Sequence, residues 1–228
     1  MNRLQAELQR LYLPPAGPQQ ATLVRALVLD LAGPASWAAL SKVWQGVQAE
    51  LGLPAPAIAV SGLNGHQLWF SLREPVPVVQ ATSFLAALRR RYLGGVAPER
   101  IASSAAGQPA NMPPVEAAPG HWAAFLAPDL AALFEDEPWL DLPPSADAQA
   151  NLLSQLESTK PEDFRRALER LQPAAGSRTG DTQLPAAAGG LEPKQFLLEV
   201  MNDSSVDLHL RIEAAKALLP YFEEDPSP

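Results

Sequence analysis

Apolar residues along the first part of the chain recur with two different spacings, which predict helices and strands in alternation. Leu4, Leu8 and Leu11 lie three or four residues apart, so residues 2–12 are predicted to form an amphipathic helix. The run 22–31 is almost wholly apolar and rich in Leu and Val, which is typical of a strand buried on both faces. The chain is therefore predicted to begin with a helix and then to enter the interior of a sheet.

The same two spacings continue to residue 92. Helical spacing covers residues 34–51 and 81–92, whereas short apolar runs at 57–61 and 66–72 predict two further strands. Between these strands, residues 62–65 read Gly-Leu-Asn-Gly, and Asn-Gly is the turn dipeptide most typical of a β-hairpin. We therefore expect the two strands to pair with each other.

The stretch 94–120 is rich in Pro, Gly and Ala and gives no clear prediction. A strand is predicted for 121–126 and a short helix for 128–134. The order of elements is that of a sheet with helices packed against it. The predicted fold class is α+β, with a small mixed sheet in a core that spans residues 1–145.

The C-terminal part is predicted to be an all-α extension interrupted by one linker. Residues 146–171 fit two short helices that extend the core. Residues 172–192 contain Gly, Ala, Pro, Ser and Thr but almost no large apolar side chain, which predicts a flexible linker. Residues 193–228 are predicted to be a helical tail, with helices at 193–201 and 206–222. A segment this short does not easily form its own core, so we expect the tail to bind a partner or to self-associate.

Composition and charge narrow the classes of function. The chain has 228 residues, no Cys and only three His, which excludes disulfides and thiolate metal sites. Its formal net charge is −8, but residues 1–100 carry nine Lys or Arg against five Asp or Glu, and residues 101–160 carry one against eight. The N-terminal part can therefore present a basic surface to nucleic acid although the whole chain is acidic.

The sequence shows no signal for a membrane. No apolar run is long enough for a transmembrane helix, and the polar N-terminus lacks the apolar segment of a secretory signal. We therefore expect a cytoplasmic protein that has no membrane partner.

Two polar features interrupt the apolar pattern of the predicted sheet. Asp30 stands near the end of the run 22–31, and the turn 61–66 combines Ser, two Gly and a His. Glycines in a turn let a phosphate approach the backbone closely, and a histidine can contact the phosphate or transfer a proton. A carboxylate at the end of a neighbouring strand can hold a divalent cation.

The segments that contain these residues resemble the sequences of a known protein family. The segment Leu-Val-Leu-Asp-Leu-Ala-Gly at 27–33, a helix, and the segment Ser-Gly-Leu-Asn-Gly-His-Gln-Leu-Trp-Phe at 61–70 are similar to the archaeo-eukaryotic primase superfamily of primase-polymerases. The resemblance covers residues 20–95. It implies a primase palm-like fold and a role in the replication of a mobile element such as a prophage or plasmid.

The resemblance also implies roles for particular residues. Asp30 and His66 would be catalytic residues of a metal-dependent nucleotidyl transfer, with Mg²⁺ or Mn²⁺ as cofactor and with Asp30 and Asp129 as metal ligands. The residues that would bind the nucleotide form the turn, namely Ser61, Gly62, Gly65 and His66. The basic residues at the end of the helix 81–92 are predicted to contact DNA or RNA, namely Arg89, Arg90 and Arg91.

The sequence departs from the family at Ala32, where the second carboxylate of the family's Asp-x-Asp motif would stand. Transfer with two metal ions needs several oxygen ligands, so whether the protein is an enzyme stays open. The alternative is a non-catalytic interaction or scaffold protein that recruits a protein partner through residues 193–222. This tail is similar to segments of phage terminase small-subunit-like proteins, which also points to a mobile element.

Each candidate also has a purely structural interpretation. Asp30 can cap the following turn, the turn 61–66 can be an ordinary hairpin, and His66 can be a buried residue with its hydrogen bonds satisfied. Arg89–Arg91 can be a solvated helix end that suits the helix dipole. The catalytic hypothesis requires Asp30 and His66 to converge in one open cleft.

Overall fold

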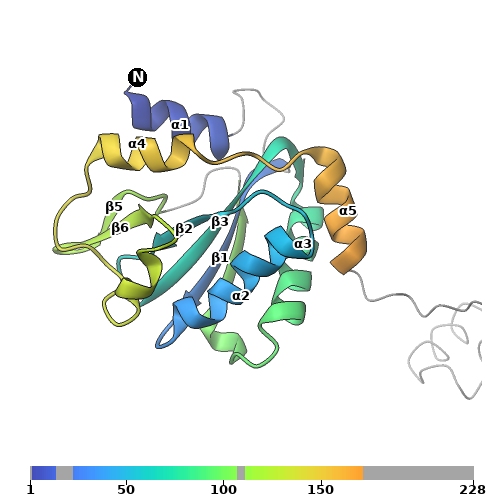
Figure 1. Cartoon of the computed structure of the whole chain (residues 1–228), viewed down its shortest axis with the longest axis horizontal. Coiled ribbons are helices and arrows are strands. Elements are labelled where there is room, and N and C mark those ends of the chain that lie inside the picture. Colours follow the sequence, from blue (N-terminus) through green and yellow to red (C-terminus); the bar gives the residue numbers. More distant parts are fainter. Residues whose placement is uncertain (1, 14–22, 107–110, 172–228) are drawn as a thin grey trace, which may run out of the picture. The chain divides into compact units, whose positions relative to one another are not determined.

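A computed structural model describes residues 2–13, 23–106 and 111–171 of the chain (Figure 1). The fold class is α+β, as predicted. In chain order the elements are the helix α1 (Arg3–Leu11), the strand β1 (Leu23–Ala32), the helix α2 (Ser36–Ala49), the strands β2 (Ala57–Val60) and β3 (Gly65–Pro77), the helix α3 (Val78–Tyr92), the 3₁₀ helix η2 (Pro98–Arg100), the strands β4 (Ile101–Ala106), β5 (Val115–Ala118) and β6 (His121–Leu126), the 3₁₀ helix η3 (Ala131–Phe134), and the helices α4 (Ala146–Ser154) and α5 (Pro161–Leu171).

The six strands form one sheet in the order β4-β1-β3-β2-β6-β5. Every neighbouring pair in this order is antiparallel, so the prediction of a mixed sheet is wrong. The reason lies in the position of β3. The chain runs from β1 through α2 to β2, but the hairpin then places β3 between β1 and β2, so these two parallel strands are never neighbours.

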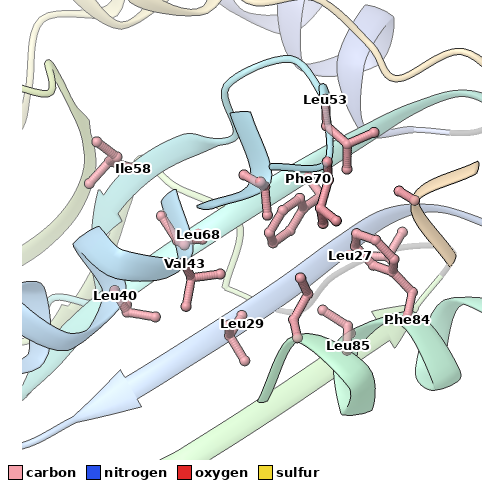
Figure 2. Packing of buried hydrophobic residues seen from close by; sticks show 14 of the residues in the cluster. Leu27, Leu29, Leu40, Val43, Leu53, Ile58, Leu68, Phe70, Phe84 and Leu85 are labelled. Carbon is pink, nitrogen blue, oxygen red and sulfur yellow. The ribbon is translucent and has the colours of Figure 1, made fainter. Parts of the chain in front are cut away.

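Helices cover both faces of the sheet (Figure 1). On one face α2, α3 and α5 pack on a large apolar cluster that includes Leu27, Leu29 and Phe70 (Figure 2). On the other face α1 and α4 pack on a smaller cluster that includes Val28 and Trp69. Successive side chains of a strand point to opposite faces, so β1 supplies leucines to the first cluster and smaller residues to the second. This arrangement confirms the prediction that the run 22–31 is buried on both faces.

Helices α4 and α5 belong to this packed unit rather than to an extension of it. The helix α4 lies beside α1, and the rings of Phe84 in α3 and Phe164 in α5 have centroids 5.1 Å apart. The division predicted at residue 145 therefore separates elements that pack together. The predicted linker 172–192 and the tail 193–228 lie outside the described residues.

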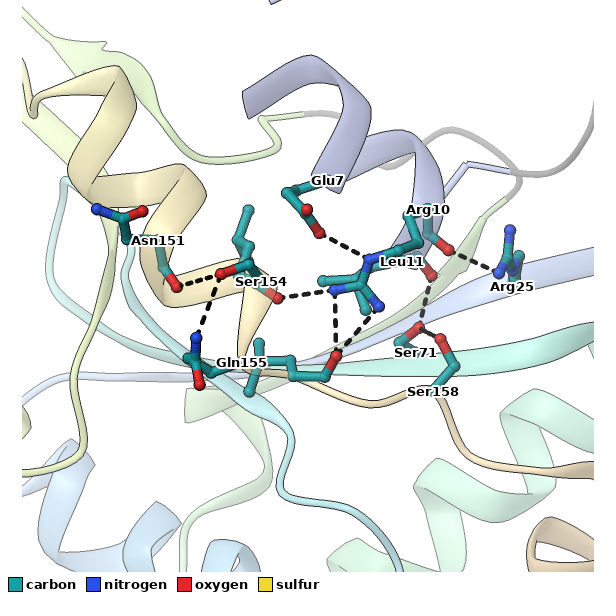
Figure 3. A network of polar contacts seen from close by, with 11 residues as sticks. Glu7, Arg10, Leu11, Arg25, Ser71, Asn151, Ser154, Gln155 and Ser158 are labelled. Atoms are coloured by element: carbon teal, nitrogen blue, oxygen red, sulfur yellow. Dashed lines mark hydrogen bonds and ion pairs between the residues drawn. The ribbon is translucent and has the colours of Figure 1, made fainter. Parts of the chain in front are cut away.

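A network of arginine contacts joins α1 to α4 and to the sheet (Figure 3). The guanidinium of Arg10 donates to the carbonyl oxygens of Leu153 at 2.9 Å and Leu156 at 3.1 Å, where α4 ends. Arg25 on β1 donates to the carbonyl oxygen of Arg10 at 2.6 Å. Carbonyls at helix C-termini lack partners within the helix, so these side chains satisfy them. Arg10 and Arg25 are therefore structural residues.

None of the helices in the described ranges is both long and apolar enough to cross a lipid bilayer.

Candidate functional site

Asp30 takes part in a short chain of hydrogen bonds on the sheet face that α1 and α4 cover. It lies on β1 opposite Gln67 of β3, and its Oδ2 accepts from Gln67 Nε2 at 2.6 Å. Gln67 Oε1 in turn accepts from Trp69 Nε1 at 2.9 Å. Asp30 is half-buried, and this burial raises the pKa of its carboxyl above the usual value, although the Gln67 hydrogen bond acts in the opposite direction.

His66 points into the other face of the sheet and is completely buried. Its Nδ1 lies 2.8 Å from the hydroxyl of Ser36, and its Nε2 lies 3.1 Å from the carbonyl oxygen of Ala131. A carbonyl can only accept, so Nε2 carries the hydrogen and Nδ1 accepts from Ser36 when the ring is neutral. Burial lowers the pKa of His66, and the Ala131 carbonyl and the Glu135 charge oppose this shift. Both ring nitrogens are thus engaged inside the protein.

Glu135 completes this buried cluster and caps α2. Its carboxylate accepts from the backbone amides of Trp37 at 3.0 Å and Ala38 at 3.1 Å, and its Oε1 lies 3.5 Å from the Ser36 hydroxyl oxygen. A carboxylate at a helix N-terminus satisfies unpaired amides and interacts favourably with the helix dipole. The order of contacts is His66, Ser36, Glu135, with the serine in the middle and buried. A hydrolytic triad needs the histidine in the middle and an accessible serine, so this cluster is not one.

The prediction that Asp30 and His66 share one open site is wrong. In the register of β1 and β3, Asp30 is paired with Gln67, and the next residue of β1, Leu31, is paired with His66. Neighbouring residues of a strand point to opposite faces, so the sheet separates the carboxylate of Asp30 from the imidazole of His66. The residue that lies beside Asp30 is Gln67, which the sequence reasoning missed. The only sequence signal for it is its position two residues before Trp69 on the same strand face.

The backbone amides of the turn before His66 form hydrogen bonds within the protein. The hydroxyl of Ser61 accepts from the backbone amides of Leu63, Asn64 and Gly65 at 3.1–3.2 Å, and the Gly62 amide donates to the Pro138 carbonyl at 3.0 Å. All four amides of residues 62–65 therefore have partners within the protein. A phosphate would have to displace these contacts, so the nucleotide-binding role predicted for the turn has no support in its geometry.

The two glycines of the turn are required by packing. A Cβ at Gly62, whose φ is +73°, would lie 2.7 Å from the Cβ of Ala117 and from the amide nitrogen of Ala123. A Cβ at Gly65 would lie 2.0 Å from the Leu31 carbonyl oxygen. The turn is thus held tightly between β1 and the hairpin of β5 and β6.

Asp129 does not lie near Asp30. It is exposed in the turn after β6, and β3 and β2 separate β6 from β1 in the sheet. Three strand spacings amount to about 14 Å, whereas two catalytic metal ions lie about 4 Å apart. Within residues 2–13, 23–106 and 111–171, no group of three or more His, Asp or Glu is arranged to hold a metal ion. The residues present therefore do not fit the Mg²⁺ or Mn²⁺ site that the resemblance implies.

The predicted arginines lie at the C-terminal end of α3, as expected. Arg90 and Arg91 are exposed and Arg89 is half-buried. Arg91 donates twice to a carboxylate oxygen of Glu50, at 2.5 and 3.1 Å, and lies over the ring of Tyr92 at 5.6 Å from its centroid. The neighbouring helix α5 adds three exposed arginines. We call these six residues the basic helical face: Arg89, Arg90, Arg91, Arg165, Arg166 and Arg170.

Acidic groups only partly neutralise this face. Helix α3 contains no Asp or Glu, and α5 contains Glu162, Asp163 and Glu169. Asp163 pairs with Arg166, and Arg170 donates to the Glu50 carbonyl oxygen at 3.0 Å. These contacts hold the face together, and Arg90 projects from it as an exposed charge.

A comparison of the chain with models of known protein families finds no match, and a search of curated proteins finds none either. The primase resemblance of residues 20–95 and the terminase resemblance of the tail therefore stay predictions. The predicted recruitment of a partner through residues 193–222 concerns a segment outside the described residues and also stays a prediction.

Proposed function

We propose that this protein binds nucleic acid through the basic helical face, as a non-catalytic component of the replication machinery of a mobile element. The observation that carries the proposal is the six arginines on α3 and α5, two helices packed against each other, of which five are exposed. Arginine is suited to phosphate because its planar guanidinium donates two parallel hydrogen bonds. The link to replication rests on the resemblance of residues 20–95 to the primase superfamily.

The non-catalytic part of the proposal rests on what Asp30 and His66 already do. Both nitrogens of His66 are bonded within a buried cluster, and Asp30 is bonded to Gln67. Ala32, two residues beyond Asp30, has no side-chain oxygen to offer a metal ion, and its carbonyl oxygen accepts from Arg100 Nε at 2.7 Å. The primase-like residues therefore support the fold rather than a phosphoryl-transfer centre.

The expected binding is electrostatic and depends on salt. Each phosphate that the face neutralises releases condensed counterions, so the logarithm of the affinity for a single strand falls by about 0.7 for each contacted phosphate per tenfold rise in salt. The acidic residues of α5 and the overall charge of −8 oppose binding. We therefore expect measurable affinity at low salt and its loss at high salt.

The first test measures the affinity of the full chain for a short fluorescent single-stranded oligonucleotide, by anisotropy, over about 25 to 200 mM salt. The double variant Arg89→Gln/Arg90→Gln is expected to bind about tenfold more weakly at low salt, with a salt slope that is shallower by about 1 to 1.5.

Two matched variants serve as controls. Arg3→Gln removes an exposed arginine from α1, which lies on the opposite sheet face, and Asp30→Asn removes the candidate metal ligand. Both are expected to bind like the wild type. Absence of binding at low salt, or binding that Asp30→Asn abolishes while Arg89→Gln/Arg90→Gln does not, would contradict the proposal.

A primer-synthesis assay tests the non-catalytic part separately. With a DNA template, nucleotides and either Mg²⁺ or Mn²⁺, the full chain is expected to form no product. A product that Asp30→Ala abolishes would show that the protein is an enzyme after all.

A further inference from the structure

An apolar groove runs along α4 at the side of the molecule where β6 ends. It consists of two adjoining cavities of about 660 and 250 Å³. They share the walls formed by Phe125 and Leu126 of β6, Leu152 of α4 and Gln155, the residue that follows this helix. We call this feature the α4 groove. Its volume is in the range of cavities that accept several large apolar side chains or a small ligand.

Exposed apolar residues gather beside the α4 groove. Leu130, which lines it, is 41% exposed, and the nearby Leu133 and Leu142 are 76% and 74% exposed. A further hollow of about 370 Å³, next to Leu133 and Leu142, shares Phe134 and Leu140 with the groove. Among the large apolar side chains exposed in the described ranges, three of five lie in this one segment. Such clustering marks an interaction surface, whereas isolated exposed leucines do not.

Exposed carboxylates lie in the same segment as these apolar residues, and Glu137 and Asp141 line the hollow next to Leu133 and Leu142. From residue 111 to 159 the chain contains no Lys or Arg. The segment that carries the exposed leucines also carries exposed acidic residues, namely Asp129, Asp136, Glu137 and Asp141. Glu135 lies in the same segment, but its carboxylate caps α2 and does not belong to this exposed set. A partner that fits this surface must therefore bring apolar side chains flanked by positive charge.

Helix α4 and the residue that follows it form one wall of the groove. Ala148, Asn151 and Leu152 of α4, with Gln155 immediately after it, line the larger cavity. The wall is also held in place, because the side-chain amide of Gln149 donates to the Phe125 carbonyl oxygen and accepts from the Phe125 amide, at 2.9 and 2.8 Å. A fixed wall reduces the entropy lost on binding. An amphipathic helix laid in a groove presents its apolar residues at i, i+3, i+4 and i+7, which suits an elongated apolar groove.

We infer that the α4 groove binds a cationic amphipathic helix of another protein. Apolar residues of that helix at i, i+4 and i+7 occupy the cavities, and its Lys or Arg residues face Asp129, Asp136, Glu137 and Asp141. None of these residues belongs to the basic helical face, so this surface is separate from the proposed nucleic-acid interface. The protein would then connect a nucleic acid with a basic protein partner.

The test uses the full chain and a fluorescent designed peptide that forms a Lys-rich helix with leucines on one face. A scrambled peptide of the same composition, in which the leucines no longer share a face, controls for simple charge attraction. The amphipathic peptide is expected to bind at least about tenfold more tightly than the scrambled one, because only it can insert its leucines together.

Variants locate the peptide on the protein. Leu130→Ser/Leu133→Ser and Asp136→Asn/Glu137→Gln/Asp141→Asn are each expected to weaken binding about tenfold, and the second variant is expected to reduce the dependence on salt. Val79→Ser is the matched control, since Val79 is 74% exposed on α3, away from the groove. It is expected to leave the affinity unchanged.

Three results would overturn the inference. Equal binding of the amphipathic and scrambled peptides would show charge attraction alone. Self-association in sedimentation experiments that Leu130→Ser/Leu133→Ser abolishes would show that the occupant is a second copy of the chain. An apolar dye that binds the groove and that the peptide does not displace would show a small-molecule site instead.

Discussion

At the scale of single residues, the environment of His66 determines how the interior responds to pH. In the neutral ring, Nε2 donates to the Ala131 carbonyl and Nδ1 accepts from the Ser36 hydroxyl. A protonated ring would donate from both nitrogens, so the Ser36 hydroxyl would have to turn towards Glu135, 3.5 Å away. Glu135 is the charged group that faces the ring. Burial outweighs its attraction and keeps the pKa of His66 below the ordinary value.

We therefore predict that the free energy of unfolding decreases as the pH falls below about 6.5, the ordinary histidine pKa. In this range the unfolded chain takes up a proton that folded His66 resists, so acid favours unfolding. The contribution is complete above this pH and is lost as the pH approaches the lower pKa of the folded state. Urea unfolding of the wild type and of His66→Gln at several pH values measures it.

The difference in unfolding free energy between the wild type and His66→Gln isolates the contribution of His66, because all other titrating groups are present in both proteins. The wild type is expected to have the steeper dependence on pH in this window. Equal slopes for the two proteins, or a wild type that gains stability as the pH falls, would show that His66 is not held neutral by burial.

Sequence reasoning placed Asp30 and the turn on adjacent strands, and this proximity is confirmed by the pairing of β1 with β3. It did not predict on which face of the sheet each of these side chains lies. The face on which a strand residue lies depends on register, and a change of one residue reverses it. The turn 61–65 joins β2 to β3, so it does not reveal the register of β1 with β3, in which Gln67 and not His66 stands opposite Asp30.

At the scale of elements, one side chain adds polar contacts to the apolar packing between α1 and α4. Arg10 reaches from α1 to the last carbonyls of α4, and it also pairs with Glu7 at 2.7 Å (Figure 3). Its stem lies between two helices that are far apart in the chain. The polar contacts therefore add to the apolar packing that holds α4, which forms one wall of the α4 groove.

We predict that Arg10→Ala lowers the free energy of unfolding by about 1 to 2 kcal/mol, because the Leu156 carbonyl loses its Arg10 donors and the Leu153 carbonyl loses one of its donors. Arg3→Ala on the same helix is the control and is expected to change stability by less than about 0.5 kcal/mol. Chemical denaturation measures both variants, and the midpoint is expected to shift without a change in slope. Equal stability of Arg10→Ala and Arg3→Ala would mean that the arginine contacts contribute nothing.

The sequence predicted elements with large apolar residues better than elements built from small ones. The strands β1, β2 and β6 and the helices α2 and α3 were predicted close to their observed bounds, because their large apolar residues reveal the periodicity. The strand predicted at 66–72 continues as β3 to Pro77. The strands β4 and β5 read Ile-Ala-Ser-Ser-Ala-Ala and Val-Glu-Ala-Ala and were not predicted. Both are edge strands, whose small side chains carry little pattern. Helices α4 and α5 were predicted as helices, but their packing partners were not evident from local spacing.

At the scale of the whole molecule, charge is divided between separate surfaces. The basic helical face lies on α3 and α5, over one face of the sheet, while α4 covers the other face. The carboxylates around the α4 groove lie in a segment without Lys or Arg. An acidic chain can bind nucleic acid only if its basic residues are grouped in this way, since scattered arginines would be neutralised by their neighbours.

The proposal that the helices, rather than the region of Asp30 and His66, bind nucleic acid can be tested by amide chemical shifts. The full chain is titrated with a short single-stranded oligonucleotide at low salt, and the shifted amides are mapped onto the fold. We expect the largest changes in residues 78–92 and 161–171, with little change at Asp30 or in residues 61–67. Changes concentrated at Asp30 and the turn, with α3 and α5 unaffected, would contradict it.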